Sequence, residues 1–401
     1  MAIDGFAHVD FDVYHRDTLP ALLGQGHGAE AAKATAGLAA LAFRLPSGDS
    51  YTYTPSAAGI AVAAGDADAA TIIEIDPEGW EGLTHDYESA AGLLYGGRVQ
   101  CARGGGMQLI AWEPALRAMY AGRPIFDPGE PLRDAAGRVL DPERSFTSAD
   151  SEEEMAEFLQ AAGYLMMRGL FDAEEIGGFL ADADALRLEA VKGDELSWWG
   201  TQPDGAEFCS RVTRAIDKPR LATLFGEPRL QRLADLADAG AKPRMGEGTG
   251  VTCVYKHPGV EEGLSDLPWH RDCGMGGHAL MCPTLITSVY LTPTNPETGE
   301  LRFLPGSARA SSAFREATDP LAPQGIGVRA QPGDVTIHFG DVMHAAPPPT
   351  GRGLDRYRVS ALCGFGRPDF KPHTGEHSYN QVLHGRGDGQ IEHLSKVAGR
   401  A

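Results

Sequence analysis

Short apolar runs separated by polar turns follow one another between positions 38 and 75 of the chain. The strand-like runs, each bounded by Gly, Ser, Pro or Asp, are LAALAFRL (38–45), SYTYT (50–54), GIAVAA (59–64) and ATIIEI (70–75). Asp76-Pro77 then indicates a helix start, because Asp is a favoured N-cap and Pro a favoured first helical residue. We predict helices in WEGLTHDYESAAGLLYG and WEPALRAMYAG, with a short strand, GRVQCA, between them. A set of strands followed by helices predicts an α+β domain over residues 1–130.

The pattern changes across a polar, proline-rich stretch, FDPGEPLRDAAGRVLDPERSFTSADSEEE, within which we predict a linker at residues 131–147. A helix, a strand and a second helix are predicted next, in EEMAEFLQAAG, YLMMRGL and AEEIGGFLADADALRLEAV. From about residue 249 the runs become short and β-like: GVTCVYK, TLITSVYLTP, ELRFLPG, GVRAQ, DVTIHFG and RYRVSALCGFG. Closely spaced strands with Gly and Pro turns favour a sandwich or barrel, of which the double-stranded jelly roll is one form. We therefore predict a mainly β second domain with flanking helices over residues 148–401.

Composition narrows the possible partners. The chain of 401 residues carries a net charge of −20, which argues against nucleic acid or an anionic membrane as a partner. Its six cysteines form no C-x-x-C pair, as expected of a reduced cytoplasmic protein. The start, MAIDGFAHVDFDVYHRD, lacks the features of a signal peptide, and no apolar run reaches the length of about 18–20 residues that spans a membrane. We expect a cytoplasmic protein that acts on a small molecule.

Three His-x-Asp triplets are candidate metal sites: His8-Val9-Asp10, His15-Arg16-Asp17 and His270-Arg271-Asp272. Two histidines and one carboxylate hold iron while leaving coordination positions open. On a strand, His-x-Asp places both side chains on one face, so a second histidine must come from another strand. The stretch QPGDVTIHFGDVMHAAPP, which follows the third triplet, offers His338 and His344. The first two triplets have no such sequel, and we expect them to be solvated surface pairs.

A basic strand follows these histidines. GLDRYRVSALCGFG places Arg356, Arg358 and Ser360 on one face, and an arginine turned inward there would need an anion. A dicarboxylate co-substrate such as 2-oxoglutarate would supply it, through a guanidinium–carboxylate pair contributing roughly 1.5–3 kcal/mol. The metal triad, the basic residue and the hydroxyl are together consistent with a 2-oxoglutarate site beside iron.

These residues carry a family resemblance. Residues 148–370 resemble the phytanoyl-CoA dioxygenase family of iron(II)- and 2-oxoglutarate-dependent oxygenases, through FLQAAGYLMMRGLF, VYKHPGVEEGLSDLPWHRD, VYLTPTNPETGELRFLPGSA, PGDVTIHFGDVMHAAPPPT and RYRVSAL. The resemblance implies a double-stranded β-helix, with iron ligands His270, Asp272 and His344. It also implies that Arg358, followed two positions later by the small Ser360, grips the distal carboxylate of 2-oxoglutarate.

Some assignments stay open at this stage. Arg356 lies on the same strand face as Arg358, and Arg352 lies in the preceding loop. We interpret His338 as a strand residue and not as a ligand. Lys256 is expected to point into the same interior, toward co-substrate or substrate. A loop at residues 273–278 is a candidate lid, and three tryptophans are candidate substrate-pocket residues: Trp269, Trp198 and Trp199.

Residues 30–125 are similar to sterol carrier protein type two domains, through DADAATIIEIDPEGWEGL and the GGRVQ strand, which implies an apolar tunnel for a lipid or acyl chain. The two resemblances together predict a dioxygenase that uses Fe(II), 2-oxoglutarate and O₂, with ascorbate as the reductant. They imply hydroxylation of an unactivated C–H of a lipid-like, isoprenoid or acyl-thioester small molecule. Alternatives are desaturation or cyclisation by the same chemistry, a lipid-binding or transfer protein with an inactive oxygenase-like half, and a cupin-like zinc or manganese protein. Asp272 argues against a halogenase, because related halogenases have a small residue at this position.

Overall fold

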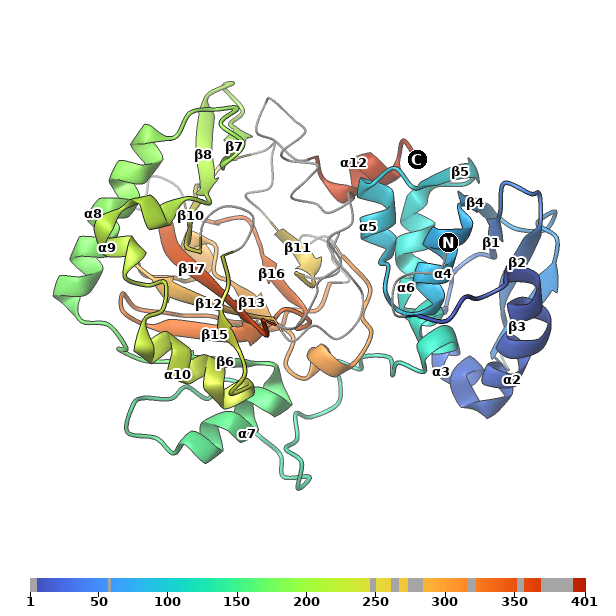
Figure 1. Ribbon diagram of the computed structural model, residues 1–401, viewed down its shortest axis with the longest axis horizontal. Helices are drawn as coiled ribbons and strands as arrows, with labels where there is room; N and C mark the ends of the chain where they lie inside the picture. Colours follow the sequence, from blue (N-terminus) through green and yellow to red (C-terminus); the bar gives the residue numbers. More distant parts are fainter. Residues whose placement is uncertain are drawn as a thin grey trace.

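The computed structural model describes residues 6–56, 59–245, 250–260, 267–272, 284–315, 322–351, 357–368 and 392–401. Figure 1 shows two lobes, one built from the first 125 or so residues and one from the β-rich remainder. The predicted fold class, an α+β region followed by a mainly β region, is confirmed. No helix within the described ranges is long and apolar enough to cross a membrane.

The first domain contains a mixed sheet in the order β3-β2-β1-β4-β5. Its strands are β1 (Leu41–Arg44), β2 (Ser50–Ser56), β3 (Gly59–Ala64), β4 (Thr71–Ile75) and β5 (Val99–Arg103). Strands β1 and β4 pair in parallel, and the other neighbours pair antiparallel. The predicted strands are therefore confirmed.

Helices cover this sheet. A helical segment near the start contains α1 (Phe11–Val13), α2 (Leu19–Leu22) and α3 (Gly28–Ala32), joined by π-helical turns at Tyr14–Thr18 and Leu23–His27. Later in the chain come α4 (Pro77–Thr84), α5 (Ala90–Tyr95) and α6 (Gly106–Ala121). The Asp76 carboxylate accepts a hydrogen bond from the Gly79 amide, as its predicted capping role requires.

The stretch predicted as one helix, WEGLTHDYESAAGLLYG, is broken in two between α4 and α5. Asp86 adopts a left-handed backbone conformation at φ 57°, which ends α4. Its buried carboxylate accepts hydrogen bonds from Arg117 Nε at 2.5 Å and from Arg123 Nε at 2.8 Å. Ser89 then caps α5 through the Gly92 amide. Sequence periodicity missed the break because its cause is a pair of arginines about 30 residues later in the chain.

The second domain contains two antiparallel sheets. The larger runs in the order β6-β15-β12-β17-β10-β8-β7, with β9 paired to the end of β17. Its strands are β6 (Tyr164–Met167), β7 (Ser197–Thr201), β8 (Glu207–Val212), β9 (Lys242–Pro243), β10 (Thr252–Lys256), β12 (Leu285–Tyr290), β15 (Val335–Phe339) and β17 (Arg358–Gly366). The smaller sheet, in the order β11-β16-β13-β14, contains β11 (Leu267–His270), β13 (Arg302–Phe303), β14 (Ile326–Gly327) and β16 (His344–Ala346). These antiparallel sheets form the predicted double-stranded β-helix.

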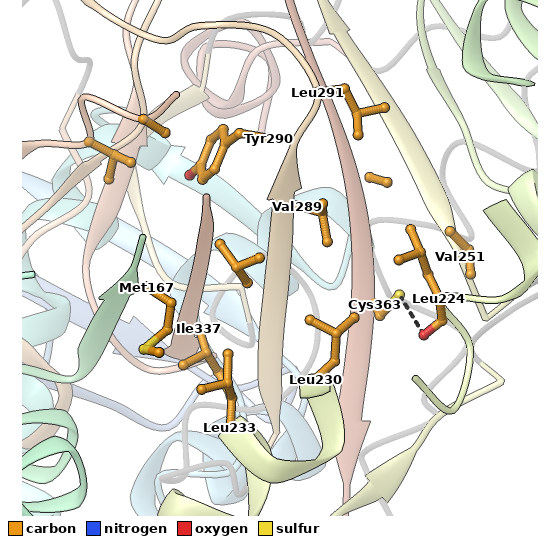
Figure 2. Packing of buried hydrophobic residues seen from close by; sticks show 14 of the residues in the cluster. Met167, Leu224, Leu230, Leu233, Val251, Val289, Tyr290, Leu291, Ile337 and Cys363 are labelled. Carbon is orange, nitrogen blue, oxygen red and sulfur yellow. Dashed lines mark hydrogen bonds between the residues drawn. The ribbon is translucent and has the colours of Figure 1, made fainter. Parts of the chain in front are cut away.

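Helices pack on one face of the larger sheet: α7 (Glu152–Ala162), α8 (Ala173–Glu189), α9 (Pro219–Ala222) and α10 (Pro228–Ala237). Figure 2 shows Val289 and Ile337 of the sheet beside Leu230 and Leu233 of α10. Because side chains alternate along a strand, the residues next to Val289 and Ile337 in sequence point to the opposite face, away from these helices. The apolar core of the second domain thus lies on the helix side of the larger sheet.

Two connections cross between the domains. The predicted linker is packed on the second domain, where Phe146 is fully buried and bridges to Met167 of β6. The C-terminal helix α12 (Leu394–Ala398) returns to the first domain and packs on α5 and α6 (Figure 1). The Tyr95 hydroxyl of α5 donates a hydrogen bond to the Glu392 carbonyl at 2.9 Å. The last residues of the chain therefore belong spatially to the first domain.

Candidate metal centre

His270, Asp272 and His344 meet at the end of the smaller sheet. His270 ends β11 and His344 begins β16, and the two residues are direct register partners with ring centroids 4.2 Å apart. Asp272 follows just beyond β11, where its backbone amide donates a hydrogen bond to the Gly340 carbonyl. One ligand atom from each of the three side chains lies within 4.8 Å of the others. The structure thus brings together the predicted triad.

Backbone carbonyls fix how the two imidazoles are presented. His270 Nδ1 lies 2.7 Å from the Pro268 carbonyl oxygen, and His344 Nδ1 lies 3.0 Å from that of Val342. Each Nδ1 therefore carries the proton and donates it, which leaves the Nε2 lone pair free to bind a metal. Both Nε2 atoms face Oδ1 of Asp272, at 3.8 Å for His270 and 3.5 Å for His344.

Burial and mutual charge set the protonation of the triad. Burial, reinforced by the neighbouring His344 ring, lowers the pKa of His270 to about 3. Burial alone would raise the pKa of Asp272, but the facing His344 and His338 rings hold it well below its usual value. Burial alone would lower the pKa of His344, but the Asp272 carboxylate raises it. An ionised carboxylate beside a neutral His270 is the donor set that a divalent metal binds.

The larger sheet turns a polar face toward the smaller one. Lys256 of β10 and Arg358 of β17 are direct register partners, and both side chains are buried. Lys256 Nζ donates to the carbonyl of Ala346, two residues after His344, at 2.5 Å. Arg358 Nη1 donates to the Gly299 carbonyl at 2.8 Å. Lys256 therefore reaches the strand that begins with His344, and Arg358 reaches the turn before β13.

The predicted residue Ser360 lies on this face beside polar groups that the sequence analysis missed: Ser288, Tyr290 and Thr336. Ser360 is buried and pairs in register with Tyr290 of β12, whose hydroxyl lies 3.1 Å from Thr336 Oγ1 on β15. Ser288 pairs in register with the same Thr336. The period-two spacing of Ser288 and Tyr290 in TLITSVYLTP indicates that both side chains lie on one strand face. Only the sheet register shows which residues of the neighbouring strands they contact.

His338 lies next to the triad. It is a strand residue of β15, as predicted, and its Nε2 atom is 3.4 Å from Oδ2 of Asp272. Its ring centroid lies 4.9 Å from that of His344. Sequence spacing predicted its strand but not this contact with the carboxylate.

The three tryptophans lie in different surroundings. Trp269 is buried in a small apolar cluster with Leu304, Met343 and Ala345. Met343 and Ala345 are the sequence neighbours of His344, the first residue of β16, so this cluster lies on the strand face opposite to the His344 ring. Trp198 packs with residues of the first-domain core, and Trp199 donates its Nε1–H to Ser197 Oγ. None of these contacts joins Trp198, Trp199 or Trp269 to a side chain of the triad.

The two early triplets hold no metal-binding arrangement within the described residues. His8 and Asp10 are exposed, as predicted, but His8 Nδ1 lies 3.3 Å from Oε2 of the buried Glu81. The prediction for His15 was wrong, because its side chain is only 3% exposed. Its Nε2 lies 2.5 Å from the Tyr53 hydroxyl, and that hydroxyl lies 2.6 Å from the Tyr120 hydroxyl. The helical segment packs on the sheet and carries His15 into the core, which a local motif does not reveal.

Some predicted features lie outside the described residues: Arg352, Arg356 and the loop 273–278. The choice of Arg358 over Arg356 is therefore not tested by the geometry of Arg356. A small cleft does lie between the domains, bordered by Glu113 and Arg117 of α6 and by His270, Arg271 and Asp341. The first domain thus reaches a residue of the triad.

The chain was compared with known proteins. Residues 159–356 match the family model described as phytanoyl-CoA dioxygenase (PhyH). A search of curated proteins finds no match. Of the solved structures, EvdMO1 is 23% identical over 54% of this chain and 50% of its own, with a TM-score of 0.42. This chain therefore spans about half the length of EvdMO1.

Two further structures are similar. AviO1 from Streptomyces viridochromogenes Tue57 is 22% identical over 56% of this chain and 98% of its own, with a TM-score of 0.44. EctD from S. alaskensis, solved with bound Fe, is 19% identical over 59% of this chain and 83% of its own, with a TM-score of 0.42. Similarity at this level supports no conclusion about reaction or substrate. The family match covers the strands that carry the triad, and residues 159–356 of this chain belong to the phytanoyl-CoA dioxygenase family of iron(II)- and 2-oxoglutarate-dependent oxygenases.

Proposed function

We propose that this protein is a hydroxylase that uses iron(II), 2-oxoglutarate and O₂ to oxidise an unactivated C–H bond of a small molecule. The observation that carries the proposal is the orientation of the triad. Two imidazoles, each tied at Nδ1 to a backbone carbonyl, turn Nε2 toward one ionised carboxylate. Opposite them lie the buried cations Lys256 and Arg358.

The triad fits an iron(II) ion. His270 Nε2, His344 Nε2 and Asp272 Oδ1 are the atoms that would hold it, because they face one another from separate parts of the chain. Two nitrogens and one oxygen leave coordination positions open for co-substrate and O₂. When bound, iron(II) would let O₂ and 2-oxoglutarate supply the oxidising chemistry that a polypeptide lacks, with release of succinate and CO₂.

The protein's own contribution is to hold and orient the co-substrate. Arg358 pairs with the distal carboxylate of 2-oxoglutarate, and Lys256, its cross-strand partner, adds a second positive charge. Ser360 lies two residues along the same strand face, and its hydroxyl would donate a hydrogen bond to that carboxylate. Because these groups are buried, the pairing takes place largely away from water, where it is strongest.

The substrate in this proposal is a lipid-like, isoprenoid or acyl-thioester small molecule. Its support is the family, whose name refers to oxidation of an acyl thioester. A lipid-delivery role for the first domain rests on the sterol-carrier resemblance and stays a prediction. The described interior of that domain is filled by large side chains, including Tyr53, Trp80 and Trp112.

The test is turnover of 2-oxoglutarate by the purified full chain. We expect succinate formation that requires added Fe(II) and rises with one class in a panel of lipids, isoprenoids and acyl thioesters. A product that gains one oxygen atom indicates hydroxylation, whereas a product that loses two hydrogens indicates desaturation or cyclisation. The His344→Ala variant should form no succinate. A folded wild-type protein that forms no more succinate than His344→Ala with any member of the panel would contradict the proposal.

A further inference from the structure

The two oxygens of the Asp272 carboxylate face different neighbours. Oδ1 faces the triad, 3.5 Å from His344 Nε2 and 3.8 Å from His270 Nε2. Oδ2 faces away from that pair and lies 3.4 Å from His338 Nε2. The carboxylate therefore divides its oxygens between the candidate metal position and a third histidine.

His338 is buried, so the N–H group of its ring needs a hydrogen-bond acceptor within the protein. Its side chain is 3% exposed, and it points from β15 into the space between the two sheets. Within the part of the chain that the structure describes, neither of its ring nitrogens makes a hydrogen bond of normal geometry. Leaving a buried N–H without a partner costs roughly 1–3 kcal/mol. Oδ2 of Asp272 is the acceptor that a small movement of either side chain would bring into range.

Resting on the function proposed above, we infer that His338 is a positioning residue for the metal centre. Its Nε2–H donates to Oδ2 of Asp272, which holds the carboxylate so that Oδ1 alone is presented to the metal. A carboxylate fixed in this way binds through one oxygen and keeps the remaining coordination positions open for co-substrate and O₂.

The arrangement favours this role over that of a fourth ligand. The described ligand atoms that lie within 4.8 Å of one another come from His270, Asp272 and His344, not from His338. The His338 ring is held beside Phe303, with centroids 5.1 Å apart, while Phe303 itself stacks on Tyr164. This packing holds the His338 ring beside the carboxylate, where its Nε2 atom lies 3.4 Å from Oδ2.

The test compares Co(II) binding by the wild type and three variants of the full chain. His338→Phe preserves a planar ring beside Phe303 but removes the N–H donor, and His338→Gln restores an N–H donor of similar reach. Ile337→Val, on the helix-facing side of the same strand, is the matched control for loss of packing. Each protein is titrated with Co(II), its Co(II) absorption spectrum is recorded, and its unfolding temperature without metal is measured.

We expect His338→Phe to lower Co(II) affinity roughly 10- to 100-fold, as loss of a group that supports a ligand typically does. His338→Gln should recover most of that loss, Ile337→Val should bind as the wild type does, and the spectrum of the saturated site should be the same in all four proteins. Unchanged affinity in His338→Phe would overturn the inference. A spectrum altered in both His338 variants would also overturn it, because His338 would then be a ligand. A wild type that binds Co(II) no better than Asp272→Ala would instead contradict the proposed function itself.

Discussion

At the scale of single residues, each triad histidine is oriented by the carbonyl two positions before it. Pro268 and Val342 accept from the Nδ1 atoms of His270 and His344, so both rings present the same nitrogen, Nε2. Because the two strands pair and orient their histidines in the same way, two distant parts of the chain turn an Nε2 atom toward one candidate metal position. Among the described residues, the ligand atoms close enough to share a metal ion come from the third triplet and His344, not from the first two triplets.

Arg358 gives the first prediction at this scale. Replacing it by Gln removes the charge that pairs with the distal carboxylate of 2-oxoglutarate, a hydrogen-bonded interaction of roughly 1.5–3 kcal/mol. We expect the KM for 2-oxoglutarate in Arg358→Gln to rise roughly 10- to 100-fold, with Co(II) affinity unchanged. Arg367→Gln is the control, because Arg367 follows the other end of β17 and pairs with Asp238 at the surface. Equal KM values in the two variants would count against the assignment of Arg358.

His15 gives a prediction about stability and pH. Burial lowers its pKa to about 4 in the folded protein, against about 6.5 in the unfolded chain. Between these values the unfolded state binds the extra proton, so stability is full above about pH 6.5 and falls as the pH drops toward 4. Lowering the pH from 7 to 5 should cost the first domain about 2 kcal/mol through this residue.

The measurement is chemical unfolding of the wild type and His15→Gln at both pH values. His15→Gln should be less stable at pH 7 but should lose about 2 kcal/mol less than the wild type between pH 7 and 5. His8→Gln is the control, because His8 is exposed, and it should follow the wild type. Identical losses in wild type and His15→Gln would show that His15 is not kept neutral by the fold.

At the scale of elements, the turn after β12 leads from the larger sheet to the smaller one and passes beside Lys256 and Arg358. Gly299 ends this turn with φ 75°, and its carbonyl accepts from Arg358. A Cβ at this position would lie 2.8 Å from Lys256 Cε and 3.0 Å from Pro349 Cγ. The glycine therefore allows the Lys256 side chain to pass close over the backbone.

Gly299→Ala should disturb both buried cations. We expect a loss of about 1–2 kcal/mol in stability from the left-handed backbone alone, and a raised KM for 2-oxoglutarate because Lys256 must move. Gly205→Ala is the matched control, since Gly205 has φ 82° but no atom within 4 Å of an added Cβ. It should lose similar stability and keep its KM. A Gly299→Ala protein with an unchanged KM would mean that Lys256 does not contact the co-substrate.

The elements also show what the sequence could predict. Apolar alternation located the strands of both domains, and the order of His270, Asp272 and His344 predicted the triad, because these signals are local or depend on chain order. The break at Asp86 and the burial of His15 were missed, since each depends on a residue more than 30 positions away. The contact of His338 with Asp272 was missed for the same reason: it depends on how β15 faces β11 across the two sheets.

At the scale of the whole molecule, the two domains form a connected unit. The last helix, α12, packs on the first domain, and Leu394 and Ala398 lie in the same buried cluster as Leu94 and Leu109. A fragment starting at residue 148 would keep α12 but lose the helices on which it packs.

Leu394→Ala tests this arrangement. It removes a fully buried side chain, which typically costs about 2–5 kcal/mol. We expect faster hydrogen exchange in α5 and α6 and a lower unfolding temperature for the first domain. Lys396→Ala, on the exposed face of the same helix, should change neither. If Leu394→Ala left exchange in α5 and α6 unaltered, the packing of α12 on the first domain would be wrong.

The most direct test of the central claim is a crystal structure of the full chain grown without oxygen in the presence of Fe(II) and 2-oxoglutarate. We expect anomalous density for one iron bound by Nε2 of His270, Nε2 of His344 and a single oxygen of Asp272, with the distal carboxylate of 2-oxoglutarate on Arg358. Iron bound elsewhere, or 2-oxoglutarate held without Arg358, would contradict the account.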